Sequence, residues 1–190
     1  MNHIAIVDDE VPILHALQRL LRAVPCTCGN QVFPLRVDTF SSPSAALDSM
    51  SHVPYDLIMT DYRMPEMDGV TLLTKARAYQ PDAARLILSG YADLNALVRA
   101  INEVEIYRFI AKPWNDYELV AAIGQALHNR ELLLENRTLA DEARVSAGNM
   151  SAEELEANRL EALEPGITKV NWAEDGSVVL DPEFRDLDET

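Results

Sequence analysis

The chain has 190 residues, of which 48% are apolar and 25% are charged, and its net charge is −15. These proportions are typical of a soluble globular protein, and no apolar run approaches the roughly 20 residues that span a bilayer. Residues 1–10 lack the basic segment and the long apolar core of a signal peptide. We therefore expect a cytoplasmic protein that does not bind membranes.

The negative charge is concentrated in the C-terminal third of the chain. Residues 1–127 carry a net charge of −5, whereas residues 128–190 carry −10. An acidic segment repels phosphate backbones, so we expect no nucleic acid to bind through it. We predict two parts: a domain at residues 1–127 and an acidic C-terminal extension at residues 128–190.

The first 127 residues alternate short apolar runs with amphipathic stretches. Because buried strands that alternate with helices form parallel sheets, the pattern predicts an α/β fold with a doubly wound, five-stranded parallel sheet. Strands are expected at residues 3–7, 35–40, 55–60, 85–89 and 106–111. Helices are expected at 11–24, from Pro43, at 68–79, at about 93–104 and from about Asn115. Ser42 and Asp68 are the expected N-caps of the second and third helices.

The first helix and the second strand are joined by the stretch VPCTCGNQVFP, which contains both cysteines. A structural zinc site needs about four ligands, and no histidine accompanies Cys26 and Cys28. The spacing indicates two reduced thiols in a loop, with a redox or metal role as the alternative. We assign no function to this stretch.

Polar residues end four of the predicted strands. The first run ends in Asp8 and Asp9, the third in Asp61, the fourth in Ser89 and the fifth in Lys112. The carboxyl ends of parallel strands share one edge, where ligands bind. Clustered carboxylates repel one another unless a cation lies among them, and hard oxygen ligands favour Mg²⁺. With a lysine and a hydroxyl to contact phosphoryl oxygens, one carboxylate could attack phosphorus and form an acyl phosphate.

Four motifs in this order, IVDDE, DLIMTDYRMPEMDG, LILSGYAD and FIAKPW, resemble the receiver domain of two-component response regulators. The resemblance covers residues 1 to about 127 and implies a CheY-like strand order of 2-1-3-4-5. It implies a phosphorelay protein, not a stand-alone enzyme. A sensor histidine kinase or a histidine phosphotransfer protein would supply the phosphoryl group.

The resemblance also implies roles for individual residues. Asp61 would be the phosphoacceptor and Lys112 the lysine that contacts the phosphoryl group. Asp9 would bind Mg²⁺ directly and Asp8 through water, together with the backbone carbonyl of Arg63.

The resemblance further implies a switch formed by Ser89 and Phe109, although Phe109 could be plain packing. Pro65 and Gly69 would shape the loop after the acceptor, and Lys112-Pro113 would be a cis peptide. Met64 and Met67 are expected to pack locally.

A phosphohydrolase is the alternative function, because phosphatases of the haloacid dehalogenase type also use an aspartate nucleophile and Mg²⁺. That class has a second acid two residues after the nucleophile, where this chain has Arg63. The pair Asp8-Asp9 favours the receiver.

The extension is expected to continue the last helix to about Ala147 and to add a helix at 151–164 and a β-hairpin at about 167–181. Ser151 and Glu154 form a capping box, and Asp-Gly is a hairpin turn. The last helix carries a weak heptad stripe, formed by Leu132, Asn136, Leu139 and Ala143. The stripe predicts either a homodimeric coiled coil or packing of the helix against the rest of the extension. We expect the extension to bind an unknown downstream protein, with a possible homodimer.

Overall fold

A single parallel sheet forms the centre of the protein. The structure is a computed structural model that describes residues 1–90, 105–147 and 151–163. Five strands pair in the order β4-β1-β5-β6-β7, all parallel. Their bounds are β1 (Asn2–Val7), β4 (Leu35–Phe40), β5 (Leu57–Asp61), β6 (Ala84–Ser89) and β7 (Arg108–Ala111). The predicted fold class and the predicted order 2-1-3-4-5 are confirmed.

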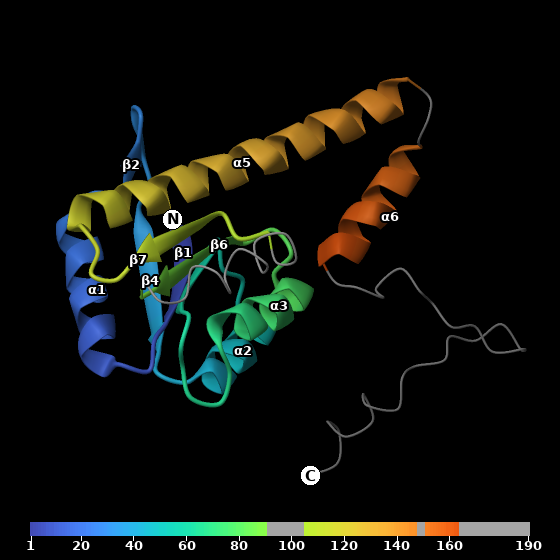
Figure 1. Ribbon diagram of the computed structural model, residues 1–190. Helices are drawn as coiled ribbons and strands as arrows, with labels where there is room; N and C mark the ends of the chain where they lie inside the picture. The colour runs from blue at the N-terminus through green and yellow to red at the C-terminus, as the bar shows by residue number, and fades with distance from the viewer. Residues whose placement is uncertain (91–104, 148–150, 164–190) are drawn as a thin grey trace, which may run out of the picture. The chain divides into compact units, whose positions relative to one another are not determined.

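Helices cover both faces of the sheet (Figure 1). The helix α1 (Val11–Ala23) and the first turns of α5 (Asp116–Ser146) lie on one face, and α2 (Pro43–His52) and α3 (Gly69–Tyr79) lie on the other. Along β1, Ile4 and Ile6 pack under α1 and α5, whereas Ala5 and Val7 pack under α2 and α3. This alternation explains why the strand sequences are apolar without a polar face.

The helix starts follow the predicted capping residues. The Ser42 hydroxyl accepts a hydrogen bond from the Ala45 amide at 3.4 Å, and the Asp68 carboxylate accepts one from the Thr71 amide at 2.7 Å. Asp68 is therefore a helix cap, as expected.

The stretch between α1 and β4 is more ordered than the predicted loop. It contains two short antiparallel strands, β2 (Thr27–Cys28) and β3 (Gln31–Val32). Both thiols are free, and Cys26 is buried in the core under α1 and α5. A two-residue strand has too few positions to show an alternating pattern, which is why the sequence did not predict this pair.

The C-terminal part contributes one further helix to the described residues, α6 (Ala152–Leu163). Its capping box is present: the Ser151 amide donates to the Glu154 carboxylate, and the Glu154 amide donates to the Ser151 hydroxyl. The chain divides into two compact units, Met1–Glu135 and Asn136–Thr190.

The predicted helix at 93–104 and the predicted hairpin at 167–181 lie outside the described residues. None of the described helices is both long and apolar enough to cross a membrane.

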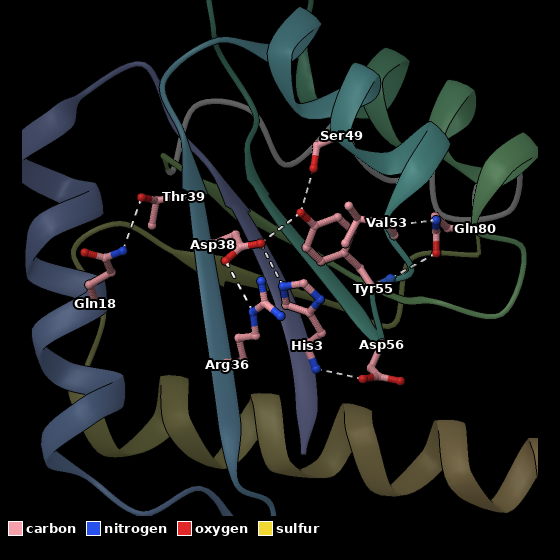
Figure 2. A network of polar contacts seen from close by, with 10 residues as sticks. All are labelled: His3, Gln18, Arg36, Asp38, Thr39, Ser49, Val53, Tyr55, Asp56 and Gln80. Carbon is pink, nitrogen blue, oxygen red and sulfur yellow. Dashed lines mark hydrogen bonds and ion pairs between the residues drawn. The ribbon is translucent and has the colours of Figure 1, made fainter. Parts of the chain in front are cut away.

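A polar network joins the edge strand β4 to its neighbours (Figure 2). The Asp38 carboxylate lies 2.7 Å from the His3 ring and accepts a hydrogen bond from the Tyr55 hydroxyl at 3.1 Å. Ser49 on α2 lies 2.8 Å from the same hydroxyl. Burial raises the pKa of Tyr55, and the bond to Asp38 adds to the rise. The network therefore holds together β1, β4, α2 and the start of β5.

We expect Tyr55→Phe to lower the free energy of unfolding by about 1 kcal/mol, because a buried hydrogen-bonded hydroxyl is lost. Urea unfolding should show a lower midpoint with an unchanged slope. The matched control is Tyr79→Phe, since Tyr79 is 54% exposed. Equal effects of the two substitutions would contradict a stabilising role for the network.

Candidate functional site

The polar residues at the strand ends meet at one edge of the sheet. Asp8 follows β1, Asp61 ends β5, Ser89 ends β6 and Lys112 follows β7. The parallel register pairs Asp61 with Leu88 and Ser89 with Ala111, so these ends are level with one another. The structure thus joins the Asp8 and Asp61 carboxylates through the Lys112 ammonium group, and the backbone register places Ser89 at the same edge.

Lys112 joins the two buried carboxylates. Its ammonium nitrogen lies 2.8 Å from Asp8 Oδ2 and 2.5 Å from Asp61 Oδ1. These distances show that the carboxylates of Asp8 and Asp61 are spaced to share one cation. The donor set is hard oxygen, which suits Mg²⁺ as well as an ammonium group.

Backbone amides bind the other oxygen of each carboxylate. The Glu10 amide donates to Asp8 Oδ1 at 2.9 Å, and the Arg63 amide donates to Asp61 Oδ2 at 2.7 Å. Both carboxylates are therefore fixed in orientation. The sequence carries no signal for these donors, because every residue except proline has an amide and no side-chain type marks the ones that are used.

Burial and the contacts between Lys112 and the carboxylates have opposite effects on the pKa values of Asp8 and Lys112. Burial raises the pKa of Asp8, which is fully buried, and the hydrogen bond from Lys112 only partly offsets this. Burial also acts to lower the pKa of Lys112, but the hydrogen bonds to Asp61 and Asp8 outweigh it and raise the pKa. Lys112 therefore remains charged, whereas the ionised form of Asp8 is disfavoured.

Asp9 lies apart from this pair and is exposed. Over residues 1–90, 105–147 and 151–163, no three His, Cys, Asp or Glu side chains are grouped so that they could hold a metal ion. Mg²⁺ typically needs only one or two protein carboxylates and keeps several waters, so the Asp8 and Asp61 pair is sufficient for it. The three predicted carboxylates are thus near one edge, but only two of them converge.

The loop after Asp61 is shaped by a close backbone approach. A Cβ atom at Gly69 would overlap the backbone carbonyl oxygen of Asp61, so only glycine fits there. The loop also contains a tight turn at Glu66, where φ is 70° and the Met67 amide donates to the Pro65 carbonyl at 2.8 Å. The close approach agrees with the expected loop-shaping role of Gly69, whereas that of Pro65 stays a prediction. The Lys112-Pro113 peptide is cis, as expected.

Ser89 and Phe109 lie on the same face of the sheet. Ser89 is buried, and its hydroxyl donates to the Gly90 carbonyl at 3.1 Å. Phe109 pairs with Ile87, two positions before Ser89, and is half-buried against the residues under α2 and α3. Met64 and Met67 also pack there, as predicted. The switch role of Ser89 and Phe109 stays a prediction.

We expect Asp8→Asn to raise the melting temperature of the metal-free protein near neutral pH, because it removes a buried carboxylate. The pKa of Asp8 is raised in the folded state, so its contribution to stability is present at low pH and lost as pH rises through that pKa. The advantage of the variant should therefore shrink as pH falls from about 8 to about 4.

Thermal unfolding in EDTA across this range measures the effect. The control is Asp9→Asn, because Asp9 is exposed. A difference between Asp8→Asn and the natural chain that does not change with pH would contradict the argument.

Comparison with known proteins identifies the family. The model of the response regulator receiver domain matches residues 4–124. A hydrogenase transcriptional regulatory protein, HoxA of Bradyrhizobium diazoefficiens, is 30% identical over 147 residues, which are 77% of this chain and 28% of the relative. The chain thus spans less than a third of that relative's length.

Two solved structures are similar over most of their length. The signal receiver domain of an HD domain-containing protein from Pseudomonas fluorescens Pf-5 has a TM-score of 0.60 and 35% identity, with 68% of this chain and 97% of that chain covered. Full-length FixJ from B. japonicum has a TM-score of 0.62 and 26% identity, with 85% and 75% covered. The strand order, the residues gathered at the edge of the sheet and the family match agree, and the chain belongs to the response regulator receiver domain family of two-component systems.

Proposed function

We propose that the chain is a phosphorelay switch whose phosphoacceptor is Asp61. The observation that carries this proposal is the position of the Asp61 carboxylate, which lies between the Lys112 ammonium and the Arg63 amide at the carboxyl edge of the sheet. Receiver domains obtain their phosphoryl group from histidine kinases or phosphotransfer proteins, and we assign the same class of donor to this chain.

The chemistry is an in-line displacement at phosphorus. A carboxylate oxygen of Asp61 forms the new O–P bond, while the P–N bond of a phosphohistidine breaks and its electron pair returns to the imidazole. Lys112 would move from the carboxylates to the incoming phosphoryl oxygens, where it would stabilise the charge of the transition state. The Arg63 amide keeps Asp61 oriented during the attack.

We propose that Mg²⁺ is the cofactor. Asp9 would bind it directly, Asp8 through water, and Asp61 and the backbone carbonyl of Arg63 would complete the protein ligands. When bound, the ion would neutralise charge on the phosphoryl oxygens. The assignment of Asp9 rests on its place in the motif IVDDE, since in this structure its side chain is exposed and lies outside the Lys112 ion pairs.

We infer that Ser89 and Phe109 form the switch. The Ser89 hydroxyl now donates to its neighbour's carbonyl, and the same hydroxyl could turn to donate to a phosphoryl oxygen on Asp61. The space that Ser89 leaves lies on the face that Phe109 shares, so Phe109 can move inward. Such a two-state rearrangement would alter the surface formed by β7 and α5.

We propose that this receiver occupies residues 1–127 and that the extension at 128–190 transmits its state through protein contacts. The net charge of −10 on the extension supports protein contacts over nucleic acid. NtrC of Klebsiella pneumoniae is named a DNA-binding transcriptional regulator, but this chain spans only 24% of its length. Its DNA binding is therefore not assigned to this chain.

We expect Asp61→Asn to abolish labelling by acetyl phosphate, because an amide is a poor nucleophile. The natural chain should take up a single phosphoryl group, and EDTA should suppress the labelling. Intact mass and peptide mapping measure the label. Asp68→Asn is the control, since Asp68 caps α3. Full labelling of the Asp61 variant at another residue would sink the assignment.

The same assay separates the receiver from the alternative, a Mg²⁺-dependent aspartyl-phosphate phosphohydrolase. A receiver labels itself and releases phosphate slowly, whereas a phosphohydrolase turns over a generic phosphate ester. Sustained release of phosphate that is lost in Asp61→Asn would favour the enzyme.

We expect the full chain to self-associate more strongly with a beryllofluoride mimic of the phosphoryl group, as measured by light scattering. The basis is the exposed side chains of Leu132 and Leu139 on α5, which a second copy could cover. A Leu132→Ala/Leu139→Ala variant should stay monomeric with the mimic. A monomeric natural chain in both states would rule out self-association as the output.

A further inference from the structure

The stretch between α1 and β4, residues 25–34, is anchored at both ends in the core, and we call it the insert. Cys26 and Phe33 are buried beneath α1 and α5, and the Phe33 amide donates to the Cys26 carbonyl at 2.8 Å. Between these anchors the chain turns at Gly29, whose φ is 58°. The insert is therefore a short two-stranded segment whose position on the receiver is fixed by the burial of its two ends in the core.

The backbone of the insert approaches α5 closely at Gly124. A Cβ atom at Gly124 would lie 2.5 Å from the Thr27 carbonyl oxygen, which is closer than real side chains approach, and 3.0 Å from its carbonyl carbon. Glycine in the middle of a helix costs about 1 kcal/mol relative to alanine. A glycine here has a physical reason, since no other residue lets the insert lie against the helix.

Three further contacts extend along the same stripe of α5. The Cys26 thiol donates to the Val120 carbonyl at 3.7 Å, and its pKa is raised by burial to about 11, so it remains a protonated donor. At the other end, the Gln31 amide group donates to the Glu131 carboxylate at 2.7 Å and lies 3.2 Å from the His128 ring. Positions 120, 124, 128 and 131 repeat at helical spacing and form one face.

A second set of bonds holds a different face of the same turn. Arg130 lies 3.0 Å from the Asp56 carboxylate and donates to the Asp82 carbonyl at 3.0 Å. Leu127 is the last α5 residue buried in the core. The helix is therefore held on two faces for one turn beyond the point where core packing ends.

We propose that the insert is a clamp, with Gly124 as its contact point, which holds α5 on the receiver as far as Glu131 and so transmits the state of the switch into the extension. This role rests on the proposed function. If α5 were free to rotate or fray at residues 128–131, a change at the surface of β7 and α5 would be absorbed there. With the clamp closed, α5 moves as one body, and the displacement continues beyond Glu131.

The decisive experiment is hydrogen exchange, measured by mass spectrometry, on the full chain carrying Gly124→Ala. Alanine strengthens the helix intrinsically, so without a clamp the exchange of residues 120–135 should slow or stay unchanged. If the clamp exists, the added methyl group forces the insert away, and exchange of residues 25–34 and 120–135 should become about tenfold faster. Slower or unchanged exchange overturns the proposal.

Two further variants sharpen the result. Gln125→Ala is the matched control, because Gln125 is the next residue of the helix and is exposed, and its exchange should match that of the natural chain. Gln31→Ala removes only the bonds to His128 and Glu131, so faster exchange should be confined to residues 128–135. Unchanged exchange in Gln31→Ala would contradict a clamp that reaches Glu131, even if Gly124→Ala failed to fold.

Transmission is tested by adding beryllofluoride and Mg²⁺. The mimic should change the exchange of residues 132–147 in the natural chain, and the change should be smaller in Gly124→Ala, although Asp61 is still labelled by acetyl phosphate. A full response in a variant whose clamp is open would overturn the transmitting role. Hydrogen exchange without the mimic tests the clamp alone. A natural chain that takes no label at Asp61 would refute the phosphorelay function, but it would not change the result of the exchange experiment on the clamp.

Discussion

The ion pairs of Lys112 are the interaction on which the arrangement of the site depends. A parallel sheet places its strand ends at one edge, and this sequence puts carboxylates at two of those ends, where burial makes their charges costly. The Lys112 ammonium lies within 2.8 Å of Asp8 and 2.5 Å of Asp61 and offsets their repulsion. The same geometry prepares the site for chemistry, because a group that balances two carboxylates is already placed to balance a phosphoryl group.

Residues at the carboxyl end of the sheet form the candidate site, whereas polar contacts elsewhere stabilise the fold. At the carboxyl end, Gly69 presses against the Asp61 backbone, and amides fix the acceptor. Residues away from that edge carry bonds that hold elements together, such as those from Asp38 to His3 and Tyr55 (Figure 2) and those from Arg130 to the residues just before β5 and β6. Substitutions in the second group should therefore change the free energy of unfolding without changing the acceptor.

The sequence predicts the central fold well because its signals are local and repeated. Apolar runs, capping residues such as Asp68 and polar strand ends are each visible within a few residues, and the parallel sheet follows from their order. The burial of Asp8 beside an exposed Asp9 could not be predicted, since adjacent residues of a strand end differ only in the side to which they point. Nor could the contact between Thr27 and Gly124, because it joins residues about a hundred positions apart and depends on a backbone approach that leaves no side-chain signature.

The helix α5 is where these constraints meet. Its first turns carry core residues such as Ile123 together with Gly124, Arg130 follows beyond the core, and its exposed part carries Leu132 and Leu139. A helix passes a displacement onward only if the turns next to its source are held, because an unheld turn frays at little cost in free energy. Core packing alone holds α5 to Leu127, whereas the bonds of Arg130 and Gln31 hold it to Glu131. The apolar side chains that a partner could cover begin at the next residue, so the last fixed turn of the receiver directly adjoins the first surface available for output.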